Sequence, residues 1–328
     1  MLRLIITVGA AAVLSGVLGY FLLPLLRALK AGQSIRELGP TWHNSKAGTP
    51  MMGGLMFIAA AIIWLLICIP TMTDNTYAVF YVLGLALCFG LIGFLDDFTK
   101  IKFKRNLGLT SLQKALLQMA VSALYLYMLY STGNLSNRFY IPFFGWTGEI
   151  HVILYIVISM FILVGGVNAV NLTDGVDGLC ATVTIPVMAF FAVVGYTKIQ
   201  LDLALLPACL VGALAAYLIY NWHPAKVFMG DTGSLFLGGA VCGMAFALDM
   251  PLILVLVGIV YLLETLSVIM QVGYFKLTHG KRIFKMTPIH HHFEMCGWKE
   301  VKIVLVFTAV CIAMCVVAWF SLGEFFAL

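Results

Sequence analysis

The chain has 328 residues, of which 62% are hydrophobic and only 10% are charged, and its formal net charge is +5. Soluble globular domains carry about 25% charged residues, so this composition excludes a soluble globular protein. The basic residues are spread over short loops that are too small to form a nucleic-acid-binding domain, and no nucleic acid partner is expected.

Ten apolar stretches predict membrane crossings, because about 20 mainly apolar residues span roughly 30 Å of hydrocarbon. In chain order they cover residues 4–26, 51–72, 76–95, 111–131, 150–170, 178–197, 201–220, 233–249, 251–274 and 301–323. Only three residues separate the eighth stretch from the ninth, so nine crossings with one long broken helix are the alternative. The expected fold is an all-α polytopic membrane protein with about ten transmembrane helices, in a single domain over residues 1–328.

The distribution of Lys and Arg predicts the orientation of these helices. Of the 19 basic residues, only Arg3, Arg138 and Lys198 lie on one side of the predicted membrane, and the other 16 lie on the opposite side. Cytoplasmic loops retain positive charge. Both termini are therefore expected outside the cell, with the odd-numbered loops in the cytoplasm.

Five aspartates follow apolar stretches on the predicted cytoplasmic side. They are Asp96, Asp97, Asp174, Asp177 and Asp231. Acidic side chains at a membrane edge are costly, and Mg²⁺ in proteins is usually held by one or two carboxylates together with a substrate phosphate. These positions predict a site for Mg²⁺ and a diphosphate on the cytoplasmic face. The MGDTG segment at 229–233 precedes an apolar stretch, which suits a phosphate near a helix N-terminus.

Polar residues recur at every third position from the end of the fifth stretch onwards. Asn168, Asn171, Asp174 and Asp177 would share one face if the helix continued through them. Gly175, in the same run, indicates a bend or a close approach of the backbone.

The ninth connection contains three consecutive histidines, His290, His291 and His292. Consecutive residues of a regular helix do not all point to one metal ion, so these side chains are better explained as donors to phosphate or sugar oxygens. Glu264 lies alone within the ninth stretch. An intramembrane acid is a functional candidate, but the sequence offers no partner for it.

Several classes of membrane protein use acidic side chains. In ion-coupled transporters the site lies near the midplane of the membrane, whereas here the acids gather at one edge. The segment NLTDGVDG at 171–178 does not meet the Asp-rich pattern of UbiA-type prenyltransferases, and DGLCAT at 177–182 lacks the arginine of CDP-alcohol phosphotransferases. The transporter remains the alternative from a different class.

Six motifs in order carry a resemblance that covers nearly the whole chain. They are GPTWHNSKAGTPMMGG at 39–54, GLIGFLDDFTK at 90–100, Lys114 after GLTSLQ, NAVNLTDGVDGL at 168–179, NWHPAKVFMGDTGS at 221–234 and KMTPIHHHFE at 285–294. With these motifs the sequence resembles the polyprenyl-phosphate N-acetylhexosamine-1-phosphate transferases. The histidine triplet favours the branch that takes a muramoyl-pentapeptide donor over relatives that use UDP-N-acetylglucosamine.

The resemblance implies a Mg²⁺-dependent phosphoglycosyl transferase of peptidoglycan synthesis. Its substrates would be UDP-N-acetylmuramoyl-pentapeptide and undecaprenyl phosphate, and its products lipid I and UMP. The same resemblance implies a multi-pass protein of the bacterial cytoplasmic membrane, a homodimer, and inhibition by nucleoside antibiotics.

Site residues carry over from the matching motifs. Asp231 would bind Mg²⁺, and Asp96 would act on the polyprenyl phosphate. Asp97 would either fix the geometry of the site or bind the metal. The residues expected to bind the donor are Lys46, Asp177, Asn221 and Phe228 at the uracil end, Lys114, Asn171 and Asp174 at the ribose and diphosphate, and His290 and His291 at the phosphates or sugar, with His292 supporting them. Asn168 and Gly175 are expected to bind substrate as well.

Overall fold

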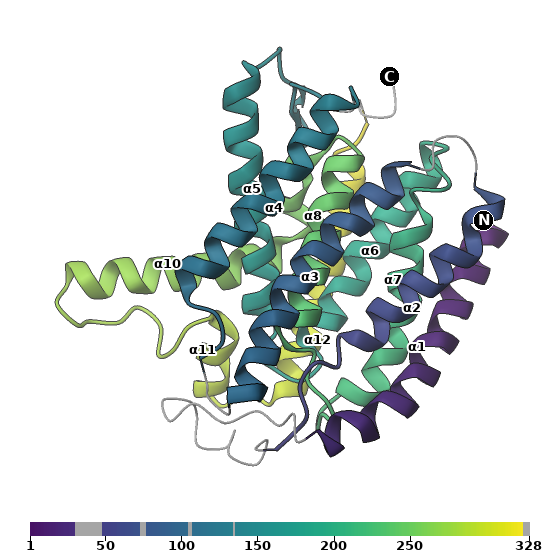
Figure 1. The fold of residues 1–328 in the computed structure, drawn as a ribbon. Coiled ribbons are helices and arrows are strands. Elements are labelled where there is room, and N and C mark those ends of the chain that lie inside the picture. Colours follow the sequence, from purple (N-terminus) through teal and green to yellow (C-terminus); the bar gives the residue numbers. More distant parts are fainter. Residues whose placement is uncertain (30–47, 73–76, 104–106, 134, 324–328) are drawn as a thin grey trace.

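The computed structural model describes residues 1–29, 48–72, 77–103, 107–133 and 135–323, and it is a bundle of helices (Figure 1). The helices are α1 (Leu2–Ala28), α2 (Leu55–Cys68), α3 (Tyr77–Phe103), α4 (Ser111–Ser131), α5 (Val152–Thr173), α6 (Leu179–Thr197), α7 (Leu205–Asn221), α8 (Gly230–Ala247), α9 (Leu254–Val257), α10 (Ile259–Leu277), α11 (Ile289–Met295) and α12 (Glu300–Phe320). Two 3₁₀ turns, η2 (Ile69–Thr71) and η3 (Pro251–Ile253), and a hairpin of β1 (Tyr140–Ile141) and β2 (Gly145–Trp146) complete the fold.

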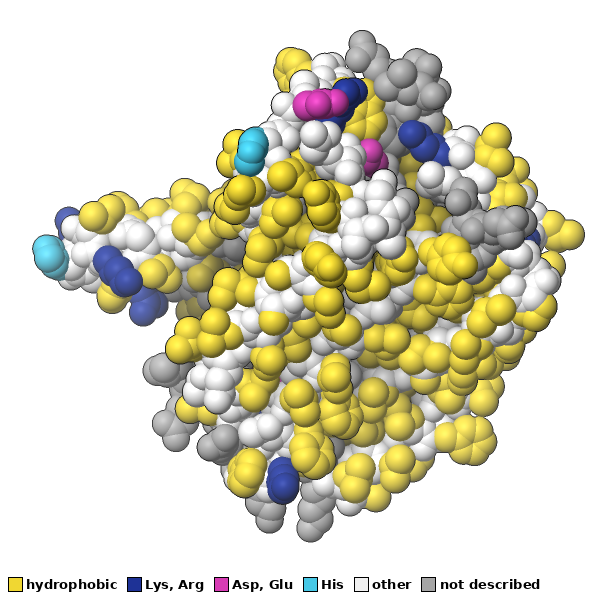
Figure 2. Space-filling view, turned by 45° about the horizontal axis from the view of Figure 1, so that its top comes forward, with side chains coloured by type: hydrophobic (Ala, Val, Ile, Leu, Met, Phe, Trp, Pro, Cys, Tyr) yellow, Lys and Arg dark blue, Asp and Glu magenta, His cyan; other side chains and the backbone are white. Residues whose placement is uncertain are grey.

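The predicted all-α polytopic membrane architecture is confirmed. Each of the ten apolar stretches contains helix, and seven of the described helices are long and apolar enough to cross a membrane. Two shorter apolar helices, α2 and α7, accompany them. Figure 2 shows a surface dominated by hydrophobic side chains, with charged side chains near the rims and on a projecting arm. The number of crossings and their orientation stay predictions.

The ninth apolar stretch departs from the single helix expected over residues 251–274. It is divided into η3, α9 and α10, with the break between α9 and α10 at Gly258. Glycine is a weak helix former, and Pro251 at the start of η3 removes a backbone donor. Beyond this break α10 lies crosswise to the other long helices and projects from the bundle (Figure 1).

The contact between α3 and α8 is the most extensive in the bundle. The two backbones lie so close that a Cβ atom built on Gly93 of α3 would collide with the backbone carbonyl of Asp231. Small residues allow the backbones of two helices to approach in this way. This contact brings the C-terminal end of α3 against the first turn of α8.

The opposite end of the bundle is closed by the hairpin and by an ion pair. The Phe139 ring stacks on Tyr155 of α5 with 4.5 Å between centroids, and the Tyr140 hydroxyl donates to the Ser321 carbonyl at 2.7 Å. Arg3 of α1 contacts the buried carboxylate of Asp202 at 3.0 Å. The two ends of the bundle therefore differ, since the aspartates of the predicted site lie at the other one.

The predicted orientation is testable with two exposed positions. Cys296 is exposed, and the Glu149 side chain is 66% exposed at the opposite end. A membrane-impermeant maleimide should label Cys296 only in inverted vesicles. In a Cys296→Ser background, Glu149→Cys should be labelled only in intact cells. Labelling of both positions from the same side would contradict an odd number of crossings between them.

Candidate active site

Three of the predicted aspartates converge where α3 meets α8. Asp96 and Asp97 lie near the end of α3, Asp231 lies in the first turn of α8, and one carboxylate oxygen from each lies within 4.8 Å of the others. Asp97 is fully buried and Asp96 nearly so. The structure therefore brings together carboxylates that are 134 residues apart in sequence.

Asp97 caps the start of α8. Its Oδ2 accepts hydrogen bonds from the backbone N–H of Thr232 at 2.9 Å and from the Thr232 hydroxyl at 2.7 Å, and its Oδ1 accepts from the backbone N–H of Asp231 at 3.3 Å. The first N–H groups of a helix lack partners within that helix, and a carboxylate satisfies them well. Asp97 thus ties the end of α3 to α8 and orients the turn that carries Asp231.

Two lysines balance the carboxylates. The Lys114 ammonium at the start of α4 lies 2.7 Å from Asp231 Oδ2, and the Lys100 ammonium lies 2.5 Å from Asp96 Oδ2 and 3.3 Å from Asp231 Oδ2. Lys114 was predicted from the sequence, and Lys100 was not. Its spacing of four residues from Asp96 on a helix was the available signal. The charged cluster therefore combines three acids with two ammonium groups.

Asn171 connects α5 to this charged cluster. Its amide Nδ2 donates to Asp231 Oδ1 at 3.0 Å and to the Ser234 hydroxyl at 2.7 Å. Asn168, one turn earlier, does something different: its amide exchanges hydrogen bonds with the Gln118 amide of α4, at 2.7 and 3.3 Å. Of the two predicted asparagines, Asn171 touches the cluster and Asn168 joins two helices.

The helix does not continue from Asn168 to Asp177, so the four polar residues do not share one helical face. The helix ends at Thr173, and Asp174 and Asp177 lie on the turn that leads to α6. Asp174 is half-buried. Burial, and then the negative charges of Asp231, Asp97 and Asp177, raise the pKa of Asp174 well above its ordinary value. This carboxyl therefore holds a proton more readily than an exposed aspartate would.

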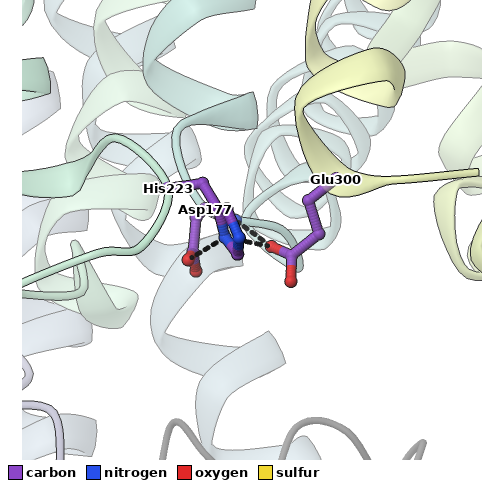
Figure 3. Close-up of side chains that lie close together, drawn as sticks. All are labelled: Asp177, His223 and Glu300. Carbon is purple, nitrogen blue, oxygen red and sulfur yellow. Dashed lines mark hydrogen bonds and ion pairs between the residues drawn. The ribbon is translucent and has the colours of Figure 1, made fainter.

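Asp177 belongs to a second cluster, formed with His223 and Glu300 (Figure 3). His223 Nδ1 lies 3.0 Å from Asp177 Oδ2 and 3.5 Å from Glu300 Oε2. Asp177 Oδ2 also accepts from the backbone N–H of Ala225 at 3.1 Å, and the Asp177 N–H donates to Glu300 Oε2 at 3.3 Å. This cluster fixes Asp177 between three segments. His223 stood within a recognised motif, but Glu300 had no sequence signal.

Asn221 and Phe228 shape the loop beside this second cluster. Asn221 Oδ1 accepts from the Gly178 N–H at 3.1 Å, and its Nδ2 donates to the Val227 carbonyl at 2.9 Å. Phe228 is half-buried, and its N–H donates to the Pro50 carbonyl at 2.8 Å. The predicted residue Lys46 lies outside the described residues.

The three histidines have three different environments. His290 is fully buried, and its Nδ1 lies 3.0 Å from Glu264 Oε2, so the isolated acid of the sequence has a partner after all. His291 Nδ1 lies 2.6 Å from Glu294 Oε2. His292 Nδ1 accepts from the Lys285 N–H at 3.2 Å, which supports the loop before α11.

Comparison with known proteins assigns this arrangement to a family. A family model described as glycosyl transferase family 4 matches residues 79–249, which is more than half of the chain. A phospho-N-acetylmuramoyl-pentapeptide-transferase from Clostridium perfringens strain SM101 is 47% identical over 321 residues, covering 98% of this chain and 97% of that relative. The chain belongs to the phospho-N-acetylmuramoyl-pentapeptide transferases of glycosyl transferase family 4.

Other phospho-N-acetylmuramoyl-pentapeptide transferases are similarly close. The enzyme from Clostridium acetobutylicum is 47% identical over 304 residues, covering 93% of this chain and 94% of the relative. The enzyme from Clostridium kluyveri is 45% identical over 324 residues, covering 98% and 100%. The long apolar helices and the identity of these relatives assign the chain to the multi-pass proteins of the bacterial cytoplasmic membrane.

The capping role of Asp97 predicts its contribution to stability. Asp97→Ala leaves the N–H groups of Asp231 and Thr232 without their buried acceptor, which should cost about 1–3 kcal/mol of unfolding free energy. The matched control is Glu149→Ala, which removes an exposed ion pair with Arg138 and should cost less than about 1 kcal/mol. Unfolding of the purified protein in mixed micelles, with EDTA and without substrate, measures both. Equal stability of the two variants would contradict the capping role.

Proposed function

We propose that this protein transfers phospho-N-acetylmuramoyl-pentapeptide from its UDP donor to undecaprenyl phosphate, giving lipid I and UMP, within a single domain of residues 1–328. The proposal rests on the activity for which relatives that match nearly the whole chain are named. The observation that carries it is the charged cluster of Asp96, Asp97 and Asp231 with two lysines at one end of an apolar bundle.

The charged cluster suits the chemistry of a diphosphate. In the reaction one phosphoanhydride replaces another, so the overall driving force is small. Catalysis depends on positioning the phosphoryl group and neutralising its charge. The ammonium groups of Lys114 and Lys100, which contact Asp231 here, would pair with phosphate oxygens when the donor binds. Asn171, bonded to the other Asp231 oxygen, would line the same region with Asp174 and Gly175.

The same carboxylates fit Mg²⁺. The three aspartates offer oxygens within 4.8 Å of one another, and Mg²⁺ takes oxygen ligands and retains waters and substrate phosphates. Asp231 would be the main ligand, with Asp97 beside it, although the Asp97 oxygens already accept from the first turn of α8. Bound there, the cation would offset the charge of the diphosphate and polarise it.

Asp96 would act on the acceptor. Its Oδ1 accepts from the Leu109 N–H at 2.8 Å and its Oδ2 contacts Lys100, so its position is fixed from both sides. A phosphate monoester has a second pKa of about 6 and is largely ionised near neutral pH. Asp96 would therefore contribute more by orienting the lipid phosphate with Lys100 than by removing a proton. A direct in-line attack is consistent with this role.

The uridine end would bind beside the second cluster. Asp177, held by His223 and Ala225, would face the uracil, and the half-buried Phe228 ring would stack on the base, with Lys46 joining them. Asn221 would act by holding two loops together, because both atoms of its amide already bond backbone groups. Asn168 would support α5 through Gln118.

The histidine segment would face the sugar and phosphates through His291, with His292 supporting the loop. A homodimer and inhibition by nucleoside antibiotics are further parts of this proposal. The related transfer from UDP-N-acetylglucosamine is the nearest competing function, and ion-coupled transport is the competing function of another class.

The donor can be tested directly. Purified protein in detergent with Mg²⁺ and undecaprenyl phosphate should form a lipid product from UDP-N-acetylmuramoyl-pentapeptide and release UMP. It should form none from UDP-N-acetylglucosamine. EDTA should abolish the product, and Asp231→Asn should lower kcat by more than a hundredfold because the main cation ligand loses its charge.

Glu149→Gln, at the opposite end of the bundle, is the control and should keep the wild-type rate. A lipid product from UDP-N-acetylglucosamine alone would overturn the donor assignment. Retained turnover near the wild-type rate in Asp231→Asn would overturn the role of that residue.

A further inference from the structure

Glu264 and His290 form a pair that is fully buried beside the active site. His290 Nδ1 lies 3.0 Å from Glu264 Oε2, and the backbone N–H of His290 donates to the same oxygen at 3.4 Å. Glu264 belongs to α10 and His290 to α11, so the two contacts fasten the start of α11 to the middle of α10. Glu264 is the intramembrane acid for which the sequence offered no partner.

A buried polar pair of this kind contributes little to the stability of the fold. Polar side chains lose hydration when they are buried, and well-packed apolar residues often serve stability as well or better. Among the described residues, Glu264 Oε1 and both ring nitrogens of His290 have no hydrogen-bond partner, so the 3.0 Å approach of Nδ1 to Glu264 Oε2 is a close polar contact and not an aligned hydrogen bond. Each unpaired buried polar atom costs about 1–3 kcal/mol. These costs favour a role in the site over a purely structural one.

The ring of His290 faces the turn between α5 and α6. A Cβ atom built on Gly175 would collide with His290 Nε2 and lie 2.6 Å from Cε1, so the turn rests directly on the edge of the ring. That turn carries Asp174, whose pKa is raised in part by the negative charges of Asp231 and Asp97 in the charged cluster. The position of this segment therefore depends on where Glu264 holds the ring.

We propose that Glu264 is a positioning residue for the transfer reaction. Glu264 keeps the His290 ring in contact with Gly175. The ring in turn fixes the position of the turn that presents Asp174 to the diphosphate of the donor. This inference rests on the proposed function for its reaction, but the position of the turn is measurable without turnover.

The uridine end should respond differently from the diphosphate end. Asp177 lies on the same turn, but it is fixed separately by His223, Glu300 and the Ala225 N–H. Losing the support of the ring should therefore misplace Asp174 more than Asp177. The expected signature is a fall in kcat with little change in the binding of UMP.

Two variants disturb the ring from opposite sides. Glu264→Gln keeps the volume and replaces the carboxyl group that contacts Nδ1 with an amide, and Gly175→Ala pushes against Nε2. Each should lower kcat at least tenfold while the Kd for UMP stays within threefold of wild type. Because both act through one ring, the double variant should lose little more than the worse single variant.

Matched controls separate positioning from loss of folding. Ser267→Ala removes a local hydrogen bond to the Glu264 carbonyl on the same helix, and Gly165→Ala adds a methyl to α5 where no atom lies within 4 Å. Both should keep the wild-type kcat. Fully additive losses in the double variant would overturn the proposal, since Gly175 would then act independently of the ring.

Hydrogen–deuterium exchange of the turn gives a readout that needs no substrate. Amides of residues 174–179 should exchange at least threefold faster in Glu264→Gln than in wild type, and Ser267→Ala should leave them unchanged. Unchanged exchange in Glu264→Gln would overturn the inference whatever the activity. If wild type makes no lipid product, the proposed function fails, and the exchange result still decides whether Glu264 positions the turn.

Discussion

The ion pairing of Asp231 is the interaction on which the rest of the site depends. Its carboxylate meets the ammonium groups of Lys114 and Lys100 on one oxygen and the Asn171 amide on the other. Partners from α3, α4 and α5 thereby converge on the first turn of α8. In an apolar bundle such charges are tolerated only where they are paired, so the geometry of four helices is coupled to the charge on one residue.

The fold followed from the sequence wherever a pattern was local. The apolar stretches predicted the helices, and the MGDTG segment was expected just before a helix, which begins within that segment at Gly230. The break at Gly258 was not predicted, because the stretch from 251 to 274 is uniformly apolar and hydropathy does not register a change of direction. Whether the fifth helix continues to Asp177 was left open, since a repeat of three residues continues through the turn; the helix ends at Thr173.

The site followed from the sequence only in part. The motifs identified Asp96, Asp97 and Asp231, but their distinct roles come from contacts between distant segments, such as the cap that Asp97 gives to α8. Glu300 and Glu264 carried no local signal that would name their partners, because each pairs with a residue on a different element. Pairing across helices is a property of packing, and a single sequence does not display it.

The central claim, that Asp231 and the lysines act as one coupled unit, is tested most directly by a double-mutant cycle on stability. Removing one partner of an ion pair leaves the other charge uncompensated. Asp231→Asn and Lys114→Met should therefore each destabilise the protein when unfolding is measured in mixed micelles without metal or substrate. The double variant should lose less than the sum of the two by about 1 kcal/mol or more. Losses that add within about 0.3 kcal/mol would contradict the coupling and with it this account of the site.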